Sequence, residues 1–294
     1  YTGTVASGSA SITIAAADLQ ALTDGTSYPL SVDVSDAAGN AATQHTSTVF
    51  AVDRIATSID AVSADWGSVL NSTEDNSDGT VSVTTSGAED GQTVTVGLNG
   101  QSYTGTVASG SASITIAASG LQALTDGTSY PLSVDVSDVA GNAATQHTST
   151  VFAVDRIAPT IDAVSADWGS GLSASEDDSD GTVSVTTSGA EDDQTVTVGL
   201  NGQSYTGTVA SGSASITIAA ADLQALTEGT SYPLSVDVSD AAGNAATQHT
   251  STVFGVDRTA PTIDAVTADW GSGLSAAEDD SDGTVSVTTS GAED

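Results

Sequence analysis

The sequence contains no cysteine and no methionine, and only three of its 294 residues are basic: Arg54, Arg156 and Arg258. Without cysteine, neither a disulfide nor a thiolate metal site can hold the fold. Against the three arginines stand 38 aspartates and glutamates, which gives a formal net charge of −35. Such a chain lacks the basic face that a nucleic-acid binder needs to displace counterions from phosphate. It also lacks the polybasic clusters that dock on anionic lipid.

Long apolar runs are missing too. Valine, isoleucine, leucine and alanine occur in short runs among serine and threonine, and none approaches the length of a membrane span. Even so, 38% of the residues are hydrophobic, which is too many for an acidic disordered tail. The composition predicts a folded acidic protein without membrane insertion in this segment, and nothing in it suggests an enzyme.

The chain repeats itself every 102 residues. Tyr1, Tyr103 and Tyr205 open the same phrase, YTGTVASGSASITIA, and only 11 of 102 positions differ between the first two periods. We expect the chain to be a window in a longer tandem array. The predicted divisions are a C-terminal part of a repeat (1–55), two complete repeats (56–157 and 158–259) and an N-terminal part (260–294). Near-identical neighbours favour spacing or polymerisation over catalysis.

Each repeat reads as an all-β sandwich. Seven short segments alternate apolar and polar residues at period two, with turn signals such as Asn201-Gly202 between them. In the sixth segment, Leu234 and Val236 should face the core while Ser235 and Asp237 face water. The segment AADLQALTEG places Leu223 and Leu226 three residues apart, which predicts one helical turn capping the core. The expected fold is a set of tandem seven-stranded immunoglobulin-like β-sandwiches joined end to end.

The immunoglobulin order of strands sorts the loops between the two ends of a sandwich. The acidic first loop (ADWGSGLSASEDDSD) and the helical segment should share the C-terminal end, and the AEDD and SDAAGNAAT loops should share the N-terminal end. Stacking would then bring the first loop of one repeat near those two loops of the next. The connector VDRIAPT is short and contains proline without flexible Gly/Ser residues. The junctions are therefore expected to be the most negatively charged places on the molecule.

The first loop has the spacing of a calcium turn. Two like charges ~4 Å apart repel by about 4 kcal/mol at a protein surface, and a hard divalent ion with six to eight oxygen ligands removes that strain. Glu176-x-Asp178-x-Asp180-Gly181 matches the first half of an EF-hand loop, but Thr187 occupies the position of the final glutamate. The alternative is an acidic loop that is only solvated. Counting one upstream aspartate per loop, the candidate ligands are Asp65, Glu74, Asn76 and Asp78; Asp167, Glu176, Asp178 and Asp180; and Asp269, Glu278, Asp280 and Asp282.

A second constellation joins the D-x-A-G-N loop, the AED loop and the connector aspartate, which one bridging ion could bind together. A type I turn explains the D-x-A-G-N loop alone, but it explains neither the AED loop nor the connector aspartate. The candidates are Asp53, Glu89, Asp90, Asp138 and Asn142; Asp155, Glu191, Asp192, Asp240 and Asn244; and the isolated copies Asp36, Asn40 and Asp257.

Other residue types give weaker signals. His45, His147 and His249 each stand alone in QHTST, which is typical of exposed strand positions. Trp168 could stack on a sugar, although a plug for the end of the sandwich is the better interpretation. Outward rows of threonine and serine could face ice or a sugar, or could be ordinary strand residues. No GxSxG or Ser-His-Asp arrangement occurs.

The phrase VSDxAGNxAxxxxxxxVFxVDRxAPTI resembles the bacterial immunoglobulin-like repeats of giant RTX-type and Bap-like surface adhesins, and most of all the extender repeats of an ice-binding RTX adhesin. The resemblance implies a β-sandwich stalk at the bacterial cell surface, exported by a type I system and made rigid by Ca²⁺ at the junctions. Its motif covers Asp138, Asn142 and Asp155 and their copies. This chain differs from the motif at two positions. Arginine stands where threonine is common, and Thr57 stands where proline is expected, so the first junction should be the least rigid.

The leading hypothesis is therefore a Ca²⁺-rigidified extender that projects a distal ligand-binding domain, lying outside this chain, and whose partners here are its own neighbouring repeats. The alternatives are repeats that bind a glycan or ice directly, or a subunit that assembles into a surface filament.

Overall fold

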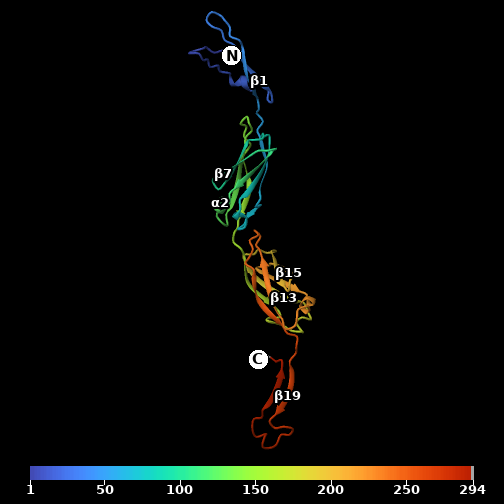
Figure 1. Cartoon of the computed structure of the whole chain (residues 1–294). Coiled ribbons are helices and arrows are strands. Elements are labelled where there is room, and N and C mark those ends of the chain that lie inside the picture. The colour runs from blue at the N-terminus through green and yellow to red at the C-terminus, as the bar shows by residue number, and fades with distance from the viewer. Residues whose placement is uncertain (293–294) are drawn as a thin grey trace. The chain divides into compact units, whose positions relative to one another are not determined.

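The computed structural model describes residues 1–292, and it divides the chain into two compact units, residues 1–155 and 156–294 (Figure 1). The boundary between Asp155 and Arg156 falls inside the predicted connector. Each unit holds one complete repeat with its own hydrophobic core, drawn from residues 66–154 in the first unit and from residues 168–256 in the second.

The first unit begins with a partial repeat and continues with a complete one. The partial repeat contains α1 (Ala16–Gln20), β1 (Ser27–Val32) and β2 (His45–Ala51). The complete repeat contains β3 (Ser58–Ala64), β4 (Val69–Leu70), the 3₁₀ turn η1 (Glu74–Asn76), β5 (Gly79–Ser86), β6 (Thr93–Leu98), β7 (Gln101–Thr106), β8 (Ser111–Ile116), α2 (Ala118–Gln122), β9 (Ser129–Asp135) and β10 (His147–Val154).

The second unit follows the same order and ends with part of a further repeat. Its complete repeat contains β11 (Thr160–Ala166), β12 (Gly171–Leu172), β13 (Gly181–Ser188), β14 (Thr195–Leu200), β15 (Gln203–Thr208), β16 (Ser213–Ile218), α3 (Ala220–Gln224), β17 (Ser231–Val238) and β18 (His249–Val256). The last part contains β19 (Thr262–Ala268) and β20 (Val285–Ser290), which pair antiparallel.

Two sheets pack face to face in each complete repeat, which confirms the predicted sandwich. In the second unit the sheets run β11-β13-β16 and β12-β18-β17-β14-β15, and in the first they run β3-β5-β8 and β4-β10-β9-β6-β7. The seven predicted strands are all present. The structure adds a two-residue strand, β12 or β4, which pairs parallel to the last strand of its repeat while the other pairs are antiparallel. Two residues are too few to leave an alternating pattern, which is why the sequence did not reveal this strand.

Period-two alternation produces the core. Strand β13 alternates buried valines, Val183 and Val185, with exposed Ser184 and Thr186. In β17, Leu234 and Val236 are fully buried, as predicted. Leu223 of the helical turn α3 and Leu226, two residues after its end, are both buried in the hydrophobic core.

The partial repeat at the start of the chain shows how much this burial depends on a second sheet. Leu30 is 43% exposed, whereas its copy Leu132 in the complete repeat is fully buried. Val5 is 53% exposed and its copy Val107 only 2%. Since the side chains are identical, the difference comes from the strands that a complete sandwich supplies.

Hydrogen bonds between loops confirm most of the predicted sorting of the loops. In the second unit, the N–H of Ala220 in α3 donates to Asp180 of the first loop (3.0 Å), and the N–H of Ala241 donates to Glu191 of the AEDD loop (2.8 Å). The first unit repeats both contacts. Among residues 1–292, no helix is long and apolar enough to cross a bilayer.

Trp168 closes the end of the sandwich and is 4% exposed, packed edge-to-face on Phe254 with ring centroids 5.2 Å apart. It can do so because residue 181 is glycine: a Cβ there would lie 2.4 Å from Cζ3 of the indole. Glycine at this position therefore serves close packing of the ring.

We predict that Gly181→Ala, combined with Gly79→Ala in the first unit, displaces the tryptophans and destabilises each sandwich by about 1–3 kcal/mol. The thermal midpoint should fall by roughly 5 °C or more, measured by circular dichroism. Gly171→Ala is the matched control, because nothing lies within 4 Å of its Cβ position and the first repeat already carries Val69 there. Equal midpoints for the Gly181 and Gly171 variants would contradict the packing argument.

Candidate metal sites and charged contacts at the ends of the sandwiches

The glutamate of the first loop has a local structural role. Glu176 accepts the N–H of Ser173 at 2.8 Å, and the Ser173 hydroxyl donates to the same oxygen at 2.7 Å. In the first unit, Glu74 accepts the N–H of Asn71 while the Asn71 side chain accepts the N–H of Glu74. These are capping-box contacts, whose S/T/N-x-x-E signature is visible in the sequence as NSTE and SASE. They explain why glutamate stands where an EF-hand has aspartate.

Two aspartates of the same loop are anchored in a similar way. Asp65 accepts the N–H of Thr80 through Oδ2 (2.9 Å), and Asp78 accepts the N–H of Ala118 through Oδ1 (2.9 Å). In the second unit Asp167 and Asp180 make the equivalent contacts, with Thr182 and Ala220. Backbone donors thus fix the orientation of each carboxylate.

These carboxylates share a cavity. Asp65, Glu74 and Asp78, with Ser77, Trp66 and Gly79, line a space of about 240 Å³. Within residues 1–292 the structure describes no hydrogen bond to Asp65 Oδ1, Glu74 Oε1 or Asp78 Oδ2, so each residue keeps one oxygen for a cation. An all-oxygen donor set of this kind fits a hard ion such as Ca²⁺. The donor atoms thus match the ligand chemistry of Ca²⁺. Their spacing does not match a bound ion, because among the described residues no three carboxylates or histidines stand close enough together to hold one.

The remaining first-loop candidates face elsewhere or make no described contact. Asn76 donates to the Ser72 carbonyl (2.6 Å), and Asp178 accepts a long hydrogen bond from Gln224 (3.5 Å). In the partial repeat at the end of the chain, Asp269 and Glu278 keep their backbone contacts, to Thr284 and Ser275. The structure describes no side-chain contact within residues 1–292 for its other two candidates, Asp280 and Asp282.

The two most buried carboxylates of the first loops are Asp75 and Asp177, only 5% and 4% exposed, and neither is among the ligands predicted from the sequence. Both occupy positions that the calcium-turn motif of the first loop leaves unspecified. Asp177 Oδ2 accepts a hydrogen bond and ion pair from Nε of Arg258, whose side chain is 23% exposed. A lone arginine in each acidic repeat was the available signal, because a scarce cation is expected to pair with a buried anion. Part of the charge of this loop is thus balanced by the chain itself.

At the other end of the sandwich, an asparagine takes up both oxygens of Asp138. The Asn142 backbone N–H donates to Oδ1 (2.7 Å) and the carboxamide Nδ2 donates to Oδ2 (2.9 Å). Burial raises the pKa of the Asp138 carboxyl, but these bonds and the N–H groups of Gly141 and Ala140 outweigh it, so the pKa lies below the ordinary 3.8.

The second constellation is assembled only in part. Glu89 accepts the N–H of Val139 (3.0 Å), and Asn142 Nδ2 also donates to the carbonyl of Asp53 (3.1 Å). The carboxylate of Asp53 instead caps the N–H of Ile55, and Asp90 binds Ser109. Since a carboxamide nitrogen already lies between the Asp138 carboxylate and the Asp53 carbonyl, a bridging ion here stays a prediction.

The other copies make matching contacts. Asp240 with Asn244, and Asp36 with Asn40, form the same side-chain pair at 2.9 and 2.8 Å. Asp192 binds the N–H of Ser211 and Asp257 caps the N–H of Thr259. The backbone N–H of Asp155 donates to Leu70, which places this connector residue at the end of its own sandwich.

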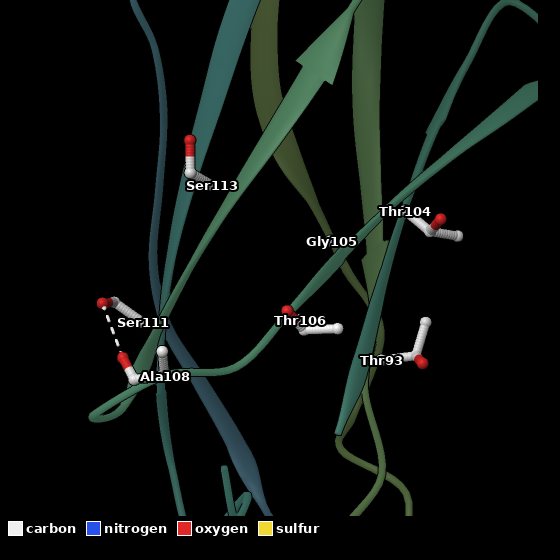
Figure 2. A pocket seen from close by; sticks show the side chains of 7 residues that line it. All are labelled: Thr93, Thr104, Gly105, Thr106, Ala108, Ser111 and Ser113. Atoms are coloured by element: carbon white, nitrogen blue, oxygen red, sulfur yellow. Dashed lines mark hydrogen bonds between the residues drawn. The ribbon is translucent and has the colours of Figure 1, made fainter. Parts of the chain in front are cut away.

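Other cavities carry little chemistry. A space of about 540 Å³ beside β7 and β8 is lined by the threonine, serine, glycine and alanine residues labelled in Figure 2, where Ser111 donates to the Ala108 carbonyl (3.2 Å). Hydroxyl groups alone, without a ring for stacking, give a weak sugar site. Trp168 could have supplied such a ring, but it is buried, as the plug interpretation predicted.

Solved structures of similar sequence identify the class of protein. A Ca²⁺-stabilized adhesin that helps an Antarctic bacterium reach out and bind ice is 34% identical over 86% of this chain and 61% of its own, with a TM-score of 0.45. A 1.5-MDa bacterial ice-binding adhesin, studied for cell-surface retention, is 33% identical over 84% of this chain and 79% of its own (TM-score 0.42). An immunoglobulin-like domain of the M. primoryensis ice-binding adhesin is 35% identical over 32% and 95% (TM-score 0.25).

The family assignment rests on the sequence identity between this chain and these relatives. It does not rest on structural superposition, because each TM-score is below 0.5. No protein-family model and no curated protein matches the chain. The fold defines a tandem array of bacterial immunoglobulin-like sandwiches. More particularly, the chain belongs to the family of immunoglobulin-like extender repeats of bacterial ice-binding RTX adhesins, and it spans 61% of the length of the first of these relatives.

The lowered pKa of Asp138 predicts acid sensitivity. A carboxylate with a depressed folded pKa contributes stability that is present above its unfolded value, near 3.8, and that is lost as the pH falls through the folded pKa. Asp138→Asn should lower the thermal midpoint at pH 7 by several degrees and flatten its fall between pH 5 and pH 2. Thermal melts across that range test this.

Asp135→Asn is the control for this experiment, because Asp135 is exposed and the hydrogen bond described for its carboxylate comes from the side chain of Gln146. If both variants flatten the acid limb equally, Asp138 is not its source.

Proposed function

We propose that the chain is the stalk of a bacterial surface adhesin: a row of immunoglobulin-like sandwiches, stiffened by Ca²⁺, that projects a distal ligand-binding domain from an extracellular surface. The observation that carries the proposal is the anchored carboxylate set of the first loop, Asp65, Glu74 and Asp78, with the same backbone contacts repeated at Asp167, Glu176 and Asp180.

Repetition favours a mechanical role. Two periods that differ at only 11 of 102 positions give every unit the same length and the same loops, and such uniformity suits a spacer. The adhesin relatives support it, since one of them is described as Ca²⁺-stabilized and as reaching out to bind ice.

Backbone N–H groups already compensate part of the negative charge of these carboxylates, and Ca²⁺ would neutralise more of it. Each anchored carboxylate gives one oxygen to an N–H and keeps the other, so an ion would bind without displacing these donors, while the carboxylates draw closer together around it. Asp65, Glu74 and Asp78 would hold it in the first unit, and Asp167, Glu176 and Asp180 in the second. Extracellular modules bind Ca²⁺ at about 10⁻⁴–10⁻³ M, so the stalk would be firm outside the cell and slack during export.

We expect Ca²⁺ at ten times its dissociation constant to add about 1.4 kcal/mol for each site and to raise the thermal midpoint by roughly 6–11 °C over the same chain in EGTA. Small-angle scattering should show a narrower distribution of end-to-end distances, and metal analysis should find bound calcium. Asp78→Asn with Asp180→Asn should reduce all three responses.

The matched control is Asp135→Asn with Asp237→Asn, which removes the same charge from exposed strand positions. A parent chain whose midpoint and scattering do not change between millimolar Ca²⁺ and EGTA would remove the calcium mechanism. Scattering that grows with protein concentration would instead favour assembly into a filament.

A further inference from the structure

The connector arginine is bound to the end of the sandwich that precedes it. Nη1 of Arg258 donates to the Leu226 carbonyl (3.1 Å) and Nη2 to the Leu223 carbonyl (2.9 Å). These are carbonyls at the C-terminal end of the helical turn α3, where a cation is favourable. Its backbone N–H donates to Glu228 at 3.0 Å. The guanidinium and the main chain are therefore held at once.

The same arrangement occurs at the first connector. Arg54 donates to the carbonyls of Leu22 (3.0 Å) and Leu19 (2.9 Å), and its N–H donates to Asp24 (2.8 Å). Two independent copies with the same donors and acceptors indicate a feature of the repeat and not an accident of one loop.

The Asp53–Arg54 peptide is held from both sides. Its N–H binds Asp24 of the preceding partial repeat, while its carbonyl accepts Nδ2 of Asn142 from the following sandwich (3.1 Å). A single peptide unit thus carries contacts to both, which leaves this part of the connector without slack.

A buried anion strengthens the arrangement in the complete repeat. Asp177 is 4% exposed and pairs with Nε of Arg258, so the guanidinium joins the first loop to the helical turn. The 1–55 segment contains no such acidic loop, and there Arg54 is exposed, whereas Arg258 is partly buried. Lysine could not replace arginine here, because its compact ammonium cannot span two carbonyls and a carboxylate with the fixed geometry of a guanidinium.

We propose that the connector arginine is a built-in clamp, which holds the connector against the end of the sandwich without a metal ion and shields the chain from trypsin-like proteases. The chain has no lysine and three arginines, so every tryptic site lies in a connector. Cleavage requires the guanidinium to leave its carbonyls and the segment to open locally. This clamp needs no metal ion, although its anion Asp177 lies in the same loop as the proposed calcium ligand Glu176.

Limited trypsin digestion of the full chain in EGTA tests the clamp, with mass spectrometry of the fragments 1–54, 55–156, 157–258 and 259–294. Asp177→Asn should raise the rate at Arg258 roughly tenfold, because a charge-assisted bond to a buried carboxylate is lost. R258K should also be cut faster at position 258 than the parent, although trypsin cleaves after arginine more readily than after lysine.

Asp193→Asn is the matched control: it removes one exposed charge at a position where the first repeat has Gly91, and it should leave the rate at Arg258 unchanged. Equal rates at position 258 in the parent, Asp177→Asn and R258K chains would overturn the clamp. If Asp177→Asn unfolds the repeat, as circular dichroism would show, R258K alone decides. Because all digestions are done in EGTA, the result does not depend on whether calcium binds.

Discussion

Carboxylates that accept backbone N–H groups are the interaction on which the ends of these sandwiches depend. The chain has almost no cations to offer them, so the loops are arranged such that peptide donors, an asparagine carboxamide and one guanidinium take that place. Asp78 binds the start of the helical turn, Glu89 binds the D-x-A-G-N loop, and Asp138 is enclosed by Asn142. Each contact joins two segments distant in sequence or closes a tight loop. The acidic residues are thus structural members of the loops as well as surface charge.

The carboxylates at the two ends of a sandwich differ in how many of their oxygens already accept hydrogen bonds. At the first loop each anchored carboxylate gives up one oxygen and keeps one, so an added cation gains ligands without displacing donors. At the D-x-A-G-N loop both oxygens of Asp138 are already bound, and an ion would have to expel the amide groups of Asn142. The first loop therefore keeps more unbound carboxylate oxygens than the D-x-A-G-N loop, and this is the reason the proposed calcium site is placed there.

The fold could be predicted from the sequence because one simple rule generates it: alternating side chains such as Val183 and Ser184 must face opposite sides of a strand. Repeats of 102 residues with turn signals between strands then leave few alternatives to a sandwich. The site was less accessible. Spacing pointed to the first loop, but it could not show that Glu176 caps a turn, that Asp177 is buried, or that Asp53 offers its carbonyl and not its carboxylate. These features depend on which backbone N–H groups of distant loops lie next to each side chain. The spacing of residues in the sequence does not show this.

The connector shows why an acidic stalk still keeps an arginine in every repeat. An ion bound at millimolar affinity leaves when its concentration falls, whereas a guanidinium attached to the chain is always present at the same high local concentration. The two carbonyls and the buried carboxylate that bind the Arg258 guanidinium all belong to the sandwich that ends at the connector. The arginine therefore holds the start of the connector in place without a metal ion. At the first junction, Thr57 replaces proline, yet it is buried and donates to the Ser86 carbonyl (2.8 Å), which supplies a local anchor in place of a fixed backbone angle. The connector is thus held by donors that are covalently part of the chain, and under the proposed calcium mechanism loss of the ion would relax the sandwich ends without releasing these contacts.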